Sequence, residues 1–336
     1  MIRSFVSGIR SIAGRVLRNR WVFRLIGVGV FVLILLKIDL REALRVLTTV
    51  NPLFVILSLG LQAIALTVAT FRWQLIMHRL AIYIPFRRSL IHQLVGTAAA
   101  LVTPGQLGEF IKVLYHRSLG FPVPESLLSV LVDRIYDLMM LLLFGFIALF
   151  VLFGVPPTLT VVLAAGGSIV LVAGFLFVRN REESARWIAT TLARISPQTY
   201  RETVRSSARR LTQWIGEFRP GFLVICGLLS FVNYVLLLLR IYSLVLALHM
   251  NVPFWYFVMV APLLRLVGLV PISISGIGTR DITAIYLFAQ VGVPQESSLI
   301  VSMLGLLTLE FQALVGLLVW WRYPLQLSKE NLPSFG

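Results

Sequence analysis

The chain has little charge for its length and almost no cysteine. Only 13% of its 336 residues are charged, and 58% are hydrophobic. Soluble domains carry about a quarter of charged residues, so soluble, nucleic-acid-binding and disordered proteins are excluded. The single cysteine, Cys226, lies in an apolar run, which excludes an intrachain disulfide and a thiolate metal site. The composition indicates an integral membrane protein.

Acidic residues are fewer than basic residues: the chain has 14 Asp and Glu against 30 Lys and Arg. In a membrane protein this excess predicts loops held in the cytoplasm beside an anionic leaflet. Residues 1–20 are basic without any acid, and residues 179–219 hold nine arginines against four glutamates. We therefore predict a cytoplasmic N-terminus, a cytoplasmic amphipathic loop at 179–219 that contacts anionic inner-leaflet lipid, and a cytoplasmic tail at 323–336.

Long apolar runs alternate with two interrupted ones. Each long run can cross a hydrocarbon core of about 30 Å. The segments 89–119 and 254–291 are broken in the middle by proline and glycine, and we interpret both as re-entrant helical hairpins, with full crossing left open. The sequence thus predicts an all-α integral membrane protein with about six to eight transmembrane helices. The long runs are residues 22–38, 53–78, 126–153, 158–178, 221–248 and 296–321.

The interruptions mark the expected hairpin tips. Irregular backbone at membrane depth is tolerated only where it is buried in protein or lines a wet cavity. Both tips are therefore expected to face the protein interior. The tip residues are Pro104, Gly105 and Gly108 in the first hairpin, and Gly276 and Gly278 in the second.

Two halves of the chain match each other in the same order and at a nearly constant separation. Residues 84–86 correspond to 252–254, and residues 119–126 to 291–297. With the predicted topology the two copies are inverted, one in the first membrane half (21–178) and one in the second (220–322). Inverted repeats with broken helices near the midplane are typical of transporters.

Ten charged residues fall in the segments predicted to lie at membrane depth. A charge at the centre of a membrane helix costs about 2.5–3.5 kcal/mol on insertion scales, so these residues must pair or face water. Two interpretations stay open: salt bridges that hold the bundle, or a polar cavity that receives a lipid headgroup. The residues are Glu109, Lys112, Asp133, Arg134, Asp137, Arg240, Arg265, Arg280, Asp281 and Glu310.

The charges suggest ligands by type. Arginine makes two-pronged contacts to phosphate, so Arg134 and Arg280 are the first candidates for a lipid phosphate, with Arg265 and Lys112 beside them. We expect no metal site, no cofactor and no catalytic residue, since the chain lacks the usual metal-ligand and nucleophile motifs.

Several of these motifs occur in an order that resembles the transmembrane region of lysylphosphatidylglycerol synthases, from about Trp21 to Trp321. The resemblance implies lipid flippase activity, and relates stand-alone members to lipids and polyprenol-linked sugars. No aminoacyl-transferase domain is expected, because the chain ends soon after the last span. The motifs are Pro104-Gly105-Gln106-Leu107-Gly108-Glu109 with Lys112, Asp133-Arg134 with Asp137, Gly276-Ile277-Gly278-Thr279-Arg280-Asp281, and Gly292-Val293-Pro294.

The resemblance carries over to Glu109, Arg134, Arg280 and Asp281, which match polar positions of that family, although the family more commonly has Glu where Asp281 stands. The leading hypothesis is a multi-pass transporter in the plasma or inner membrane. It would move an anionic phospholipid, an aminoacyl-lipid or a polyprenyl-phosphate-linked lipid between leaflets, and Glu109 and Asp281 would couple protons or recognise an amine. Membrane lipids are the expected partners and nucleic acid is not. A homo-oligomer or a partner lipid-modifying enzyme is left open.

Two alternatives remain. One is a polyprenyl-phosphate-dependent glycosyltransferase, or its membrane partner, with Asp133, Asp137 or Glu109 as base or metal ligand. The other is a scaffold whose arginine-rich loop recruits a cytosolic enzyme.

Overall fold

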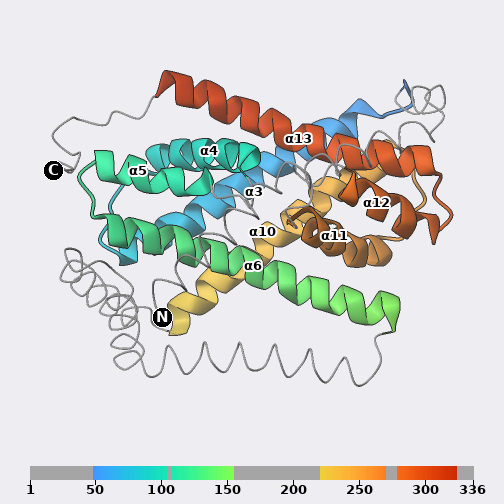
Figure 1. Ribbon diagram of the computed structural model, residues 1–336, viewed down its shortest axis with the longest axis horizontal. Helices are drawn as coiled ribbons and strands as arrows, with labels where there is room; N and C mark the ends of the chain where they lie inside the picture. The colour runs from blue at the N-terminus through green and yellow to red at the C-terminus, as the bar shows by residue number, and fades with distance from the viewer. Residues whose placement is uncertain (1–47, 104–107, 155–219, 270–277, 324–336) are drawn as a thin grey trace, which may run out of the picture.

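The computed structural model describes residues 48–103, 108–154, 220–269 and 278–323, and this part of the chain is helical with no strand. The described helices form one bundle (Figure 1). In chain order they are α3 (Pro52–Arg79), α4 (Phe86–Val102), α5 (Ile111–Ser118), α6 (Val123–Phe153), α10 (Pro220–Ala247), α11 (Phe254–Leu269), α12 (Thr279–Ala289) and α13 (Gln295–Arg322).

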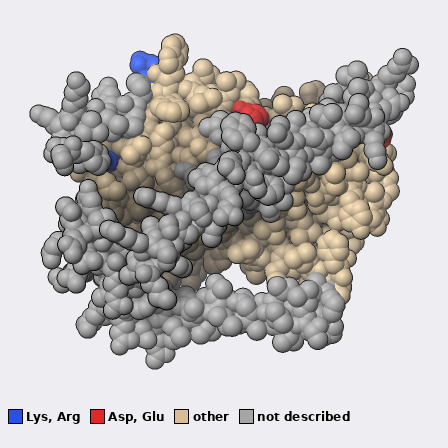
Figure 2. Space-filling model, in the orientation of Figure 1, with Lys and Arg blue, Asp and Glu red and all other residues tan. Residues whose placement is uncertain are grey.

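Four of the described helices, α3, α6, α10 and α13, are long and apolar enough to cross a membrane. Many of their large apolar side chains point outward, such as Leu142 on α6 and Val224 on α10. On the face in Figure 2, the visible described residues accordingly show few charged side chains. An all-α membrane protein is therefore confirmed. The predicted spans at 22–38 and 158–178 lie outside the described residues, as do the termini and the arginine-rich loop.

Helix boundaries follow from local sequence. The Asn51 side chain accepts a hydrogen bond from the Leu53 N–H (3.0 Å) and caps α3, whose first residue is a proline that needs no donor partner. A helix C-terminus is set in a similar way by local sequence: α6 ends at Gly154, which has a φ of +54°. A left-handed residue of this kind closes a helix, and glycine adopts it without steric cost.

The eight described helices form two units with the same order: a long helix, two short helices and a long helix. The lengths are 28, 17, 8 and 31 residues in the first unit and 28, 16, 11 and 28 in the second. The first three pairs of corresponding helices begin at one constant offset along the chain, and the last pair begins at a slightly larger one. This is the spacing of the repeat seen in the sequence.

The two short helices of each unit form an antiparallel hairpin. In the first unit the α4 residue His92 lies beside His116 near the end of α5, with ring centroids 5.6 Å apart. Nearer the tip, a side chain at Gly108 would overlap the backbone of Ala99, so the chain doubles back on itself. In the second unit the Tyr256 hydroxyl donates to the Leu287 carbonyl (2.6 Å). Of the tip residues, Pro104, Gly105 and Gly276 lie outside the described part.

The two units exchange their packing partners. Helices α3 and α10 run antiparallel through the centre of the bundle (Figure 1). At one end of this pair the Asn51 N–H, before α3, donates to the carbonyl of Ala247, the last residue of α10 (2.9 Å). The α4–α5 hairpin packs on α13 and the α11–α12 hairpin packs on α6 (Figure 1). Each hairpin is thus held partly by the last long helix of the other unit.

The contact between α4 and α13 depends on a glycine. A Cβ at Gly316 would overlap the Leu94 carbonyl and lie 2.8 Å from the Ala98 Cβ. We predict that Gly316→Ala lowers the free energy of unfolding by about 1–3 kcal/mol through overpacking. Gly305→Ala in the same helix is the control, because a Cβ there meets nothing within 4 Å. Thermal unfolding in detergent measures both, and equal midpoints would contradict the packing argument.

Candidate functional site

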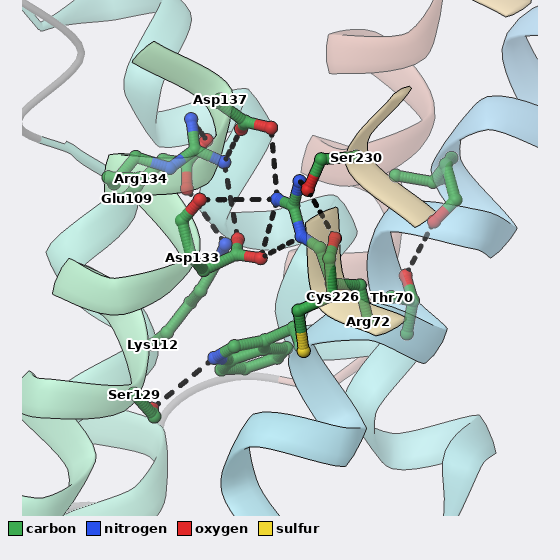
Figure 3. A network of polar contacts seen from close by, with 12 residues as sticks. Thr70, Arg72, Glu109, Lys112, Ser129, Asp133, Arg134, Asp137, Cys226 and Ser230 are labelled. Carbon is green, nitrogen blue, oxygen red and sulfur yellow. Dashed lines mark hydrogen bonds and ion pairs between the residues drawn. The ribbon is translucent and has the colours of Figure 1, made fainter. Parts of the chain in front are cut away.

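A network of buried charges lies where α3, α5, α6 and α10 meet (Figure 3). Its centre is Arg72, in α3, which is fully buried. Its guanidinium donates twice to one carboxylate oxygen of Asp133, from Nε (2.9 Å) and Nη2 (2.6 Å). It also contacts Asp137 (2.9 Å) and donates to the Ser230 hydroxyl of α10 (2.8 Å). All donor nitrogens of this arginine therefore have partners.

A second arginine extends the network toward α5. Arg134 lies 2.8 Å from Glu109 and 2.8 Å from Asp137, and 3.4 Å from Asp133. Lys112 completes the group with an ion pair of 2.8 Å to Glu109. Three cations thus meet three carboxylates, so the network is electrically neutral.

Helical spacing explains how these residues converge. Asp133 and Asp137 are four residues apart on α6, and Glu109 and Lys112 are three apart, so each pair shares a helix face. The Lys112 stem crosses α4 at Gly96, where a Cβ would come within 2.5 Å of Cε. Arg72 and Asp133 have no exposed side-chain surface, whereas Arg134 and Asp137 keep 21% and 17%. The network therefore has a closed end and an accessible end.

The second unit arranges its charges differently. Arg240 in α10 is 3% exposed and donates to the Thr308 hydroxyl (2.6 Å) and, at 3.5 Å, to the Gly305 carbonyl of α13. Its Nε is buried and has no hydrogen-bond partner among the described residues. Arg265, in α11, lies within electrostatic range of both Arg240 and Asp137. No carboxylate of the described part of the chain is within ion-pair distance of Arg240.

The remaining charges of the second unit sit on α12 and α13. Arg280 donates to the hydroxyl (3.1 Å) and the carbonyl (3.0 Å) of Ser302, and lies 3.7 Å from Asp281. Asp281 accepts from the Gly278 N–H (2.9 Å) and the Ser302 hydroxyl (2.6 Å), so it caps the start of α12. Glu310 is on the exposed face of α13 and forms no ion pair within the described ranges.

The structure thus gathers the sequence candidates into two groups and leaves Glu310 apart. Glu109, Lys112, Asp133, Arg134 and Asp137 form the neutral network, and Arg240, Arg265, Arg280 and Asp281 belong to the second unit. One central charge and three hydroxyl partners were not among the residues predicted from the sequence. The internal repeat could have identified Arg72, because Arg72 and Arg240 occupy the same position in their helices, counted from the start of each. The missed residues are Arg72, Ser230, Ser302 and Thr308.

Comparison with known proteins relates this architecture to one family. The family described as "Lysylphosphatidylglycerol synthase TM region" matches residues 21–316. A "UPF0104 membrane protein" of Methanothermobacter thermautotrophicus is 22% identical over 297 residues, which cover 82% of this chain and 86% of the relative. The matched region includes every charged residue of both groups.

The Arg72–Asp133 pair supplies a test of the network. Asp133→Asn leaves a buried guanidinium without its main counter-charge, and loss of one partner of a buried pair costs about 3–5 kcal/mol. We expect a clear fall in the thermal midpoint in detergent. The double variant Arg72→Gln/Asp133→Asn should lose much less than the sum of the two single changes, because neither charge is then left alone. Additive losses would show that the pair is not coupled.

Proposed function

We propose, from the premise that this chain belongs to the lysylphosphatidylglycerol synthase transmembrane-region family, that it moves an anionic lipid between the leaflets of the cell membrane. The observation that carries the proposal is the gathering of charged side chains inside a bundle that exposes many large apolar side chains (Figure 3). Such an interior can accept a headgroup while the acyl chains stay in the bilayer. Charges placed at membrane depth commonly mark a substrate pathway.

In this proposal the two hairpins are re-entrant and the two units are inverted. In each unit the hairpin follows the C-terminal end of the first long helix and precedes the N-terminal end of the second. Both ends of the hairpin therefore lie at one end of the unit. The antiparallel course of α3 and α10 supports this arrangement, because the two hairpins would then open toward opposite faces of the membrane. Alternating access would follow from movement of one unit against the other around a fixed site.

The first-unit network would act as the gate. Its accessible end, Arg134 with Asp137, is where an incoming headgroup can exchange partners with the ion pairs. Glu109 joins α5 to α6 through Arg134, so release of this contact would free the first hairpin. A phosphate could take the place of the carboxylate on Arg134, and an amine could take the place of the guanidinium on Glu109.

Transport accounts for the carboxylates better than glycosyl transfer does. A catalytic base or metal ligand needs a free carboxylate lone pair directed at its target. Glu109, Asp133 and Asp137 are instead each held by arginine or lysine at 2.6–2.9 Å. These ion pairs favour a role in conformational change.

The transport proposal is tested in proteoliposomes. We expect fluorescent anionic, aminoacylated or polyprenyl-phosphate lipids to become inaccessible to an external quencher as they cross the bilayer. Glu109→Gln and Arg134→Ala should each lower the rate by about tenfold or more, since each removes a charge-assisted contact of the gate.

The matched control is Arg87→Gln, because this arginine is exposed at the start of α4. It removes the same kind of charge outside the network and should leave the rate unchanged. Size-exclusion profiles identify any variant that fails to fold. Wild-type rates in both gate variants, or no movement of any lipid by well-folded protein, would refute the proposal and favour the transferase alternative.

The proposed topology makes a separate prediction. In a Cys226→Ala background, single cysteines at Tyr83 and Val123 should react with an impermeant maleimide only after the cells are permeabilised. Cysteines at Asn251 and Gln290, which are exposed at the other end of the bundle, should react in intact cells. Both short loops of one hairpin would then be on one side. Labelling of 83 and 123 from opposite sides would show that the first hairpin crosses the membrane fully.

A further inference from the structure

The internal repeat places a glycine in the second unit where the first unit has its central carboxylate. Arg240 stands in α10 where Arg72 stands in α3, counted from the start of each helix. By the same count, Gly305 stands in α13 where Asp133 stands in α6. The contacts agree with this alignment, because Arg72 donates to Asp133 and Arg240 lies 3.5 Å from the Gly305 carbonyl. One buried arginine thus has a counter-ion, and its equivalent has none among the described residues.

The space for the missing carboxylate is present. Gly305 is buried, yet a Cβ built on it would meet nothing within 4 Å. Beside it, the buried Nε of Arg240 has no hydrogen-bond partner in the described part of the chain. A buried charge without a counter-ion is strongly unfavourable, so an anion from outside the chain would be stabilised in this position.

The surroundings of Arg240 carry further positive charge. Arg265 and Arg280 are both within electrostatic range of it. The buried acid of this unit within the described ranges, Asp281, already accepts from Gly278 and Ser302. The sequence of the hairpin tips, residues 104–107 and 270–277, contains no acid. Among the described residues, three arginines against one aspartate leave two positive charges uncompensated.

From this charge balance we propose that Arg240, Arg265 and Arg280 bind the phosphate monoester of a lipid headgroup, in the space beside Gly305. A phosphate monoester carries about −1.5 to −2 at neutral pH, which matches the excess, whereas a diester carries a single charge. Guanidinium groups also present paired donors that fit phosphate oxygens. The inference rests on the proposed lipid transport and narrows its substrate class. Diacylglycerol phosphate and polyprenyl phosphate share this chemistry.

Binding to the purified full chain in detergent tests the site. The probes are dioleoyl phosphatidic acid, its methyl diester with the same acyl chains, and a short polyprenyl phosphate. Affinity is measured by the ligand-induced rise of the thermal midpoint over a titration. We expect both monoesters to bind at least about tenfold more tightly than the diester, as expected from one additional charge-assisted contact.

Two variants locate the phosphate. Gly305→Asp supplies in the second unit the carboxylate that Asp133 supplies in the first, so it should abolish the preference for monoesters while it raises the midpoint of the ligand-free protein. Arg87→Gln removes an exposed arginine at the start of α4, outside this site, and should bind as the wild type does. Arg240→Gln should also lose the preference. Retained preference in Gly305→Asp, or equal binding of monoester and diester by the wild type, would overturn the assignment.

The two monoester arms distinguish the lipid source. Tighter binding of polyprenyl phosphate than of phosphatidic acid would show that the protein also recognises the polyprenyl chain. Equal affinity would show that recognition is confined to the phosphate. The translocation assay keeps this inference separate from the transport proposal. If diester lipids cross the bilayer and the protein shows no preference for monoesters, the phosphate site is refuted and transport is not. Monoester binding without movement of any lipid would refute transport alone.

Discussion

The need to neutralise charge inside an apolar bundle governs the rest of this structure. Arg72 has no exposed surface, and it is held by Asp133 and Asp137 on α6 and by Ser230 on α10. This one guanidinium therefore ties the central pair of helices to the long helix that follows the first hairpin. In a low-dielectric interior such a contact is strong when complete and very unfavourable when broken, so it fixes how α3, α6 and α10 pack.

The same demand is met differently in the two units. The first unit supplies its own carboxylates and is neutral. The second surrounds Arg240 with a hydroxyl and a carbonyl, and its acid, Asp281, is used to cap α12. Duplicated helices of similar length therefore have unequal charge. In the proposed transporter, this difference separates a neutral gate in the first unit from a part of the second unit that would receive an anion.

Re-entrance of the two interrupted segments stays a prediction. The sequence predicted the helical class and the long apolar segments that are described, because these depend on local hydrophobicity, and its prolines and glycines indicated where the short helices are interrupted. It also listed the charges at membrane depth, but it could not assign their partners. Partner choice depends on which helix faces meet, and Arg72 pairs with a residue 61 positions away. Arg72 was missed because it lies in an apolar run near other arginines, and only its alignment with Arg240 distinguishes it. Glu310 stays a predicted site residue. Hydropathy alone predicts that it lies at membrane depth, but does not say which side of the helix it is on, and the structure has it on the exposed face of α13.

The exchanged packing of the hairpins connects the two charge groups. Helix α11 belongs to the second unit but packs on α6, and its Arg265 acts electrostatically on Asp137 of the network as well as on Arg240. An anion bound beside Arg240 would attract Arg265 and so weaken its hold on Asp137. Because Asp137 also contacts Arg134, which binds Glu109, the change would reach the first hairpin through these two successive ion pairs. In the proposed transporter, headgroup binding in one unit would thereby loosen the gate in the other, as alternating access requires.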